Sequence, residues 1–325
     1  MGLMPIEKRG ITKSRLIYGV MNLGGARGRD ALTKRDIRAA EEAIDAAMSI
    51  GITMFDHADV YRNGKAEEAF GHILHSRPGL REQITIQSKC GIRLDEGGIA
   101  VQYDLSKTWI LRAVDATLRR LQTEYLDILL LHRPDPLLQY DEVADAFSSL
   151  TEAGKVRFFG VSNMSASQMR ELQRHIAEPL VIDQLEMSLG KRDFVEHEIL
   201  VNGEHRPDVS FPDGTLQYCQ THDVQLQAWA SLARGIYSGA TTDPDNRAQL
   251  DTSALVTEMA TSRTTSREAI VLAWLLRHPA NIQPVIGTID TDRIRACEDS
   301  VRQAELMTRN DWYSLFISAR GSNPP

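Results

Sequence analysis

The sequence predicts an α/β fold, a closed (β/α)₈ TIM barrel that forms a single domain over residues 1–325. Short apolar runs alternate with longer amphipathic segments, and eight such pairs follow one another. The apolar runs are continuous, as in parallel strands buried on both faces. Eight strand–helix units in a chain of this length match a closed barrel. A doubly wound sheet is the alternative, but residues 22–28 after the first run lack the GxGxxG spacing expected there.

The elements are expected in the following order. Residues 6–14 alternate weakly around Lys8-Arg9-Gly10 and predict an N-terminal β-hairpin. The expected barrel strands are residues 16–20, 53–55, 84–87, 126–131, 157–161, 180–183, 225–229 and 282–286. Apolar residues at helical spacing predict helices over 36–50, 107–121, 143–150, 168–175 and 268–278, with C-terminal helices near 311–319. Two long segments, 190–213 and 233–249, follow the sixth and seventh strands, and the first has the character of a lid or an insertion.

Composition and charge exclude several classes of function. The formal net charge is −7, and Lys and Arg form no basic run, so we expect no nucleic-acid partner. No apolar stretch is long enough to span a bilayer and no secretory signal is visible, so we expect a cytoplasmic protein without a membrane partner. The three cysteines show no metal-binding spacing and predict free thiols. We expect a monomer or a weak oligomer.

Ionisable residues follow several of the expected strands directly. Asp56, Lys89 and His132 come at the ends of the second, third and fourth strands, where a barrel of this kind places its active site. One such residue alone is better explained as a structural ion pair, but three on successive strands favour a site. Tyr61 completes the set, because a nearby lysine lowers the pKa of a tyrosine and a carboxylate holds that lysine charged. The four residues form a general acid/base set suited to carbonyl reduction.

Other chemistries have weaker support. Asp56, His57 and Asp59 resemble a metal site, but adjacent strand residues point to opposite faces and no second His pair follows, so we expect no metal. A nucleophile elbow of the GxSxG type is absent, and so is a P-loop.

With these motifs the sequence resembles the aldo-keto reductase family, from Gly19 to about Val301. The family pattern Asp-x4-Tyr matches Asp56 to Tyr61, its lysine matches Lys89, and its histidine matches His132. The stretch 143–163 is most similar to a bacterial subgroup of predicted oxidoreductases.

The resemblance implies that NADP(H) binds in an extended form across the barrel mouth, with NAD(H) as the other candidate. It implies that Ser162, Asn163 and Gln184 hold the nicotinamide carboxamide and that Trp229 stacks on the nicotinamide ring. The remaining expected cofactor residues surround the phosphates: Ser231, Leu232 and Arg234 at the pyrophosphate, and Gly287, Thr288 and Arg293 at the adenosine phosphate. Arg293 is the expected ligand of the 2′-phosphate.

Three positions depart from the family pattern. Asp290 places a carboxylate in the adenosine-phosphate segment, and Cys297 stands where the family often has Asn. Both weaken the expectation of NADP over NAD. Met21 replaces an aromatic pocket wall, which predicts a wider or softer substrate pocket.

The expected function is therefore NADP(H)-dependent reduction of a small carbonyl substrate, an aldehyde or a ketone, to an alcohol, with Tyr61 as general acid. The alternative is a catalytically weak, nicotinamide-binding regulatory subunit. A further alternative is an unrelated barrel enzyme with a phosphate site after its last two strands.

Overall fold

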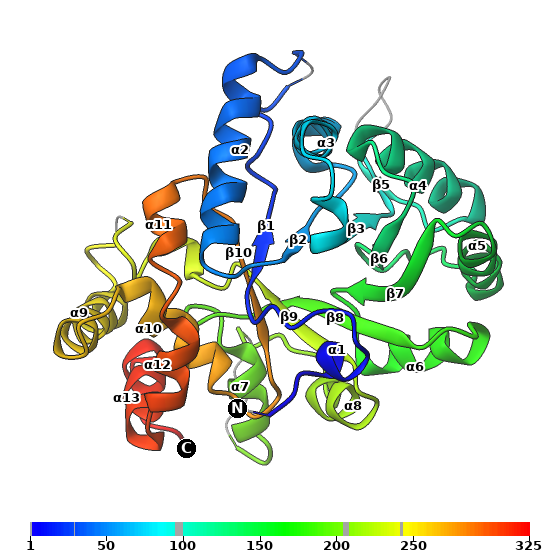
Figure 1. Ribbon diagram of the computed structural model, residues 1–325. Coiled ribbons are helices and arrows are strands. Elements are labelled where there is room, and N and C mark those ends of the chain that lie inside the picture. The colour runs from blue at the N-terminus through cyan, green and yellow to red at the C-terminus, as the bar shows by residue number, and fades with distance from the viewer. Residues whose placement is uncertain (1, 29, 95–99, 204–207, 241–242) are drawn as a thin grey trace.

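Eight parallel strands close into a barrel, and helices surround it (Figure 1). We describe the fold from a computed structural model, which covers residues 2–28, 30–94, 100–203, 208–240 and 243–325. The order around the barrel is β1-β10-β9-β8-β7-β6-β3-β2. The strands are β1 (Ile17–Gly19), β2 (Met54–Asp56), β3 (Thr85–Cys90), β6 (Leu126–Leu131), β7 (Val156–Ser162), β8 (Leu180–Glu186), β9 (Gln225–Trp229) and β10 (Gln283–Ile286). The predicted (β/α)₈ barrel is confirmed.

Amphipathic helices cover the outside of the barrel and begin at clear capping residues. Thr33 with Asp36, Ser165 with Gln168, and Thr308 with Asp311 form capping boxes. The helices are α2 (Lys34–Ser49), α3 (Lys65–Ser76), α4 (Lys107–Leu121), α5 (Tyr140–Glu152), α6 (Ala166–His175), α7 (Asp193–Ile199), α8 (Thr215–Thr221), α9 (Arg247–Ser262), α10 (Arg267–Leu276), α11 (Thr291–Arg295), α12 (Ser300–Leu306) and α13 (Arg309–Arg320). Short 3₁₀ turns are η1 (Tyr61–Gly64), η2 (Arg81–Gln83) and η3 (Ala233–Gly235).

The N-terminal segment differs from the prediction. A single helical turn, α1 (Pro5–Lys8), replaces the expected hairpin over residues 6–14. Pro5 at the first helical position favours this turn. The turn buries Met4 and Ile6 in an apolar cluster with strand residues, namely Ile17, Met54, Ile128, Leu130, Val181, Ile182 and Val285. A free hairpin would not bury these side chains, so packing against the barrel interior outweighs the weak local alternation.

The loops at the barrel mouth hold structure that periodicity does not reveal. A small antiparallel hairpin, β4 (Ile92–Arg93) with β5 (Gln102–Tyr103), follows β3 and was not predicted. The expected loop 190–213 contains α7, and its residues 204–207 lie outside the described ranges. The segment 233–249 begins with η3 and ends in α9, with residues 241–242 outside the described ranges.

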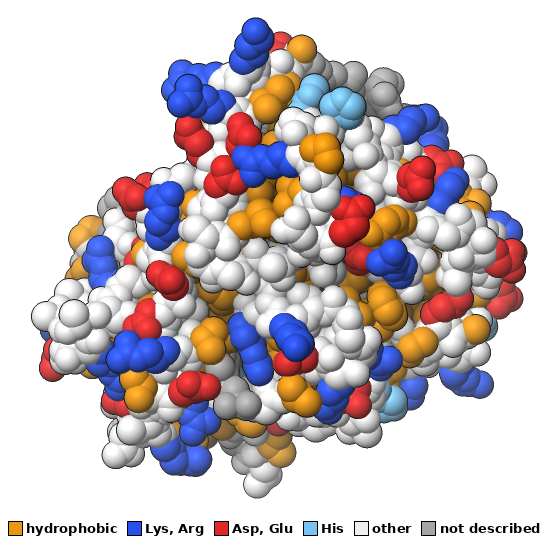
Figure 2. Space-filling model, viewed as in Figure 1, with side chains coloured by type: hydrophobic (Ala, Val, Ile, Leu, Met, Phe, Trp, Pro, Cys, Tyr) orange, Lys and Arg blue, Asp and Glu red, His pale blue; other side chains and the backbone are white. Residues whose placement is uncertain are grey.

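The surface carries both signs of charge. Figure 2 shows Lys and Arg side chains interspersed with Asp and Glu across the viewed face, rather than gathered into one basic field. Within the described ranges, no helix combines the length and the apolar character that a membrane crossing requires.

Candidate active site

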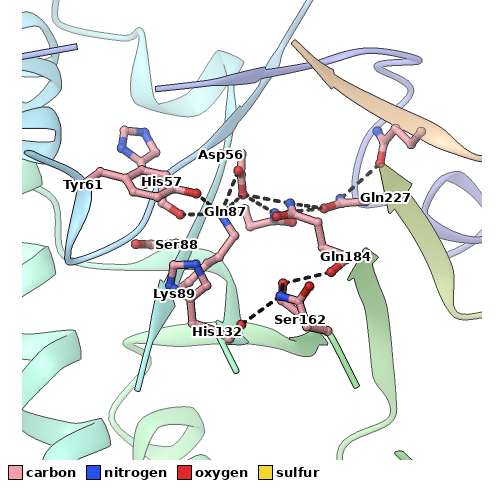
Figure 3. Close-up of polar contacts among 12 residues, drawn as sticks. Asp56, His57, Tyr61, Gln87, Ser88, Lys89, His132, Ser162, Gln184 and Gln227 are labelled. Carbon is pink, nitrogen blue, oxygen red and sulfur yellow. Dashed lines mark hydrogen bonds and ion pairs between the residues drawn. The ribbon is translucent and has the colours of Figure 1, made fainter. Parts of the chain in front are cut away.

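The ends of β2, β3 and β6 bring the predicted ionisable residues together. Asp56 is the last residue of β2, Lys89 lies near the end of β3, and His132 follows β6 directly. The Lys89 Nζ donates to Asp56 Oδ1 at 2.6 Å and Oδ2 at 2.7 Å, and to the Tyr61 hydroxyl at 3.1 Å (Figure 3). The backbone carbonyl of His57 accepts from the same ammonium at 2.9 Å. One buried lysine therefore joins the carboxylate to the tyrosine.

Tyr61 lies on η1, a turn that neighbouring segments hold firmly. Arg62 and Asn63 in this turn have φ values of 53° and 59°, in the left-handed region that costs free energy for residues other than glycine. The loop after β1 offsets that cost. Arg62 donates to the Asn22 side chain at 2.9 Å, and the Lys65 ammonium donates to the Ala26 carbonyl at 2.8 Å. The turn thus keeps the tyrosine hydroxyl beside Lys89.

The Lys89–Asp56 pair is fully removed from water. The exposed fractions of the two side chains are 1% and 3%. Burial disfavours the ammonium, but Asp56 and Tyr61 outweigh burial and hold the pKa of Lys89 above its ordinary value. The lysine is therefore charged at neutral pH, and a buried charge of this kind is stable only with such partners.

The pKa of Tyr61 moves in the opposite direction from the prediction. Burial raises the pKa of Tyr61 above its ordinary value, and Lys89 lowers it only in part. The predicted effect of the lysine is present, but burial of the phenol outweighs it. Tyr61 is therefore protonated at neutral pH, with a cation ready to stabilise its anion.

His132 faces Tyr61 across the barrel mouth. Their ring centroids are 6.0 Å apart, with the rings nearly perpendicular at 84°. Burial, and then the charges of Lys89 and Arg133, hold the pKa of His132 well below its ordinary value. The imidazole is neutral at neutral pH, so one of its ring nitrogens is a donor and the other is an acceptor.

The residues expected to hold the nicotinamide carboxamide form one connected group. Asn163 Nδ2 donates to Ser162 Oγ at 2.8 Å, and Ser162 Oγ donates to the Gln184 backbone carbonyl at 2.9 Å. The indole N–H of Trp229 donates to Asn163 Oδ1 at 3.2 Å, which fixes the ring. Gln184 Nε2 donates to Asp56 Oδ1 at 3.1 Å. The structure thus links this group to the Asp56–Lys89 pair.

The residues that are expected to bind the cofactor phosphates lie along the loops after β9 and β10. Ser231 is buried and donates to the Val285 carbonyl at 2.7 Å, so its hydroxyl joins the loop after β9 to strand β10. The Gly287 carbonyl accepts from the Asn22 side chain, and the Thr288 carbonyl accepts from the Tyr18 hydroxyl. Leu232 is partly buried and Arg234 is exposed beside it.

Arg293 lies against the loop after β9. Its NH2 donates to Ser238 Oγ at 3.0 Å, and its Nε donates to the buried carboxylate of Glu268 at 3.3 Å. Asp290 caps α11, since its Oδ1 accepts from the backbone N–H groups of Asp292 and Arg293. Two carboxylates therefore lie close to the expected 2′-phosphate ligand.

Sequence reasoning missed three buried glutamines next to this site. Gln87, Gln227 and Gln283 are 0% exposed and lie inside the barrel on β3, β9 and β10. Gln87 Nε2 donates to Asp56 Oδ1 at 2.5 Å. A polar residue within an apolar strand run was the available signal, but only the strand register shows that these residues meet.

Comparison with known proteins identifies the family. The family model described as "Aldo/keto reductase family" matches residues 15–308. The chain is 34% identical to the oxidoreductase YcsN of Bacillus subtilis, over 96% of each chain. It is 35% identical to a 6-dehydroglucose reductase of Agrobacterium fabrum, over 95% of each chain. The solved glycerol dehydrogenase of Gluconobacter oxydans has the same fold, with a TM-score of 0.77 at 23% identity over 96% of this chain and 93% of that one. This chain is an oxidoreductase that belongs to the aldo/keto reductase family.

Proposed function

We propose that the protein catalyses reversible NADP(H)-dependent reduction of an aldehyde or ketone to an alcohol, with Tyr61 as the proton donor. The observation that carries this proposal is the buried Lys89 ammonium, which bonds both the Asp56 carboxylate and the Tyr61 hydroxyl. Family membership supports an oxidoreductase that uses a nicotinamide cofactor.

Tyr61, Lys89 and Asp56 would manage the proton. Tyr61 is protonated at neutral pH, as a general acid in the reduction direction must be. When the phenol gives its proton to the forming alkoxide, the Lys89 ammonium at 3.1 Å stabilises the tyrosinate. Asp56 keeps the ammonium charged and in place throughout.

His132 would orient the carbonyl. Its ring is neutral and lies edge-on to Tyr61, so a ring N–H can donate to an oxygen held between the two rings. A charged imidazolium would compete with Tyr61 as the acid, and burial beside Lys89 prevents that charge.

The residues present fit a nicotinamide group. Gln184 Nε2 is engaged by Asp56 and Gln227, and within the described ranges its Oε1 has no hydrogen-bond donor, so it can accept from a carboxamide N–H. Trp229, with its N–H fixed on Asn163, presents a ring for stacking. When bound, the cofactor supplies the hydride that reaches the carbonyl carbon.

Arg293 supports NADP(H) as the cofactor, because its planar cation suits a 2′-phosphate. The Glu268 carboxylate at 3.3 Å from Arg293 and the Asp290 cap oppose a further anion there. NAD(H) is therefore the second candidate cofactor.

The purified protein tests this proposal directly. We expect NADPH to quench its tryptophan fluorescence, and we expect an aromatic aldehyde to start NADPH consumption. Cofactor binding without consumption, over a panel of carbonyls, would favour the regulatory subunit. Quenching by inorganic phosphate as strong as that by NADPH would favour an unrelated barrel with a phosphate site.

A further inference from the structure

One layer of the barrel interior is polar where barrels usually hold branched apolar side chains. The strand register places its members next to one another: Asp56 pairs with Gln87, Gln184 with Gln227, and Gln227 with Gln283. All five side chains are buried, with at most 2% of each residue exposed. Burying five polar groups is costly unless each is hydrogen-bonded, so the bonds among them need an account.

The amides form a continuous chain from the loop before β1 to Asp56. Gln283 Nε2 donates to the Ser14 carbonyl at 2.6 Å, and Gln227 Nε2 donates to Gln283 Oε1 at 3.2 Å. Gln227 Oε1 in turn accepts from Gln87 Nε2 at 2.9 Å and from Gln184 Nε2 at 3.0 Å. Both of these amides also donate to Asp56 Oδ1, as Figure 3 shows.

Chemistry at the two ends fixes the direction of every amide in this chain. A backbone carbonyl can only accept, so Gln283 must point its NH₂ at Ser14 and its oxygen at Gln227. Gln227 must then point its NH₂ at Gln283 and its oxygen at Gln87 and Gln184. Asp56, an ionised carboxylate, also only accepts. The two ends therefore agree on one orientation: turning Gln227 or Gln283 would break bonds of both its oxygen and its nitrogen, and turning Gln87 or Gln184 would break both bonds of its nitrogen.

Ser14 is a firm anchor for this chain. Its hydroxyl donates to the Leu16 carbonyl at 2.7 Å and accepts from the Thr53 backbone N–H at 3.1 Å. These bonds tie the segment before β1 to the segment before β2. The carbonyl that starts the amide chain is therefore held by the barrel framework.

We propose that Gln227 is a positioning residue for the reaction, since its single carbonyl orients Gln87 and Gln184 so that both donate to Asp56 while the Gln184 oxygen stays free for the cofactor carboxamide. This inference rests on the proposed function of the site. One amide, that of Gln227, would then position both the donors to Asp56 and the Gln184 oxygen that accepts from the cofactor. The two amide donors hold the Asp56 carboxylate in place beside Lys89, and the bond to Gln227 fixes the acceptor that Gln184 offers to the cofactor.

Replacing Gln227 tests the proposal. Gln227→Met keeps the length of the side chain and removes the amide. We expect kcat to fall about tenfold and the Kd for NADPH to rise about fivefold, because a hydrogen bond that acts on a charged group is lost. A merely structural residue would not raise the Kd for NADPH in the folded protein.

Gln283→Met and Gln225→Met complete the series. Gln283 lies farther along the chain, so its loss should give the same changes at about threefold. It also carries the test if Gln227→Met does not fold. Gln225 is the matched control: it is 0% exposed, lies on the same strand, and donates to the carbonyls of Leu226 and Asn281 instead. Its variant should keep kcat and the Kd for NADPH within about twofold of the wild-type values.

The outcomes separate this inference from the proposed function. Wild-type rates and wild-type NADPH affinities in both Gln227→Met and Gln283→Met would overturn the inference and leave the proposed function standing. Equal losses in Gln227→Met and Gln225→Met would also overturn it. If the wild-type protein reduced no carbonyl, the proposed function would fail, and the NADPH affinities of the same variants would still decide whether Gln227 orients Gln184.

Discussion

Asp56 shows what a buried carboxylate needs in this protein. Its two oxygens accept from the Lys89 ammonium, and Oδ1 also accepts from two buried amides. Asp183, one residue before Gln184 on β8, is equally buried, but within the described ranges it has neither a lysine nor a glutamine amide as a partner. Burial raises the pKa of Asp183 well above its ordinary value, and the backbone amide of Met164 offsets this only in part.

Asp183→Asn should therefore stabilise the fold increasingly as pH rises. Between the ordinary carboxyl pKa near ~4 and the raised value in the folded protein, the folded wild type keeps a proton that the unfolded chain has lost. Across that window the contribution of Asp183 to the free energy of unfolding therefore falls by about 1.4 kcal/mol per pH unit, and Asn removes this contribution. Urea unfolding of both proteins from pH 5 to pH 8 measures the difference.

The control for this prediction is an exposed carboxylate. Asp115→Asn changes a side chain that pairs with Lys155 at the surface, so its effect should stay nearly constant over the same range. Parallel stability curves for wild type and Asp183→Asn would show that Asp183 does not carry a raised pKa.

At the scale of elements, α13 holds α7 in place after β8. Arg320 at the end of α13 donates to Glu196 of α7 at 2.9 Å, and the two side chains are only 7% and 4% exposed. Phe194 of α7 packs edge-on to Trp274 of α10. Trp274 and Trp312 stack and exchange hydrogen bonds from each indole N–H to the other's backbone carbonyl. The C-terminal helix α13 thus supports α7, the helix that follows β8.

Arg320→Met should loosen α7. Removing one partner of a buried ion pair leaves Glu196 with less compensation, and we expect a loss of about 2–4 kcal/mol in the free energy of unfolding. Amide hydrogen exchange in residues 193–199 should rise first, since these residues lose their contact with α13.

Arg38→Met is the matched change at an exposed pair on α2, where Arg38 and Glu42 are 80% and 57% exposed. It should cost less than about 0.5 kcal/mol and leave exchange in α7 unchanged. Equal effects of the two variants would refute a role for α13 in holding α7.

At the scale of the whole molecule, local sequence predicts the barrel strands and several helices, among them α4 with its observed bounds 107–121, while tertiary contacts decide the N-terminal segment. The strands 126–131 and 225–229 were predicted with the observed bounds, because continuous apolar runs between polar breaks define buried parallel strands. The prediction of an N-terminal hairpin was wrong. Met4 and Ile6 are buried against apolar side chains of the barrel strands, and a hairpin on the surface would leave them more exposed.

The arrangement of the candidate site was predictable in part. The tyrosine, lysine, aspartate and histidine positions could be read from the ends of successive strands, and the structure brings them together. The raised pKa of Tyr61 was not predictable, because it depends on how deeply the turn after β2 is buried. The glutamine chain depends on the register of β8, β9 and β10, which no single strand encodes.

The most direct test of the central claim compares wild type with Tyr61→Phe in the reduction of an aromatic aldehyde at saturating NADPH. Phe keeps the ring and removes only the proton donor beside Lys89. We expect NADPH to bind both proteins with Kd values within about twofold, while turnover by Tyr61→Phe falls at least about 100-fold. Reduction of the aldehyde by Tyr61→Phe at the wild-type rate would contradict the assignment of Tyr61 as the proton donor.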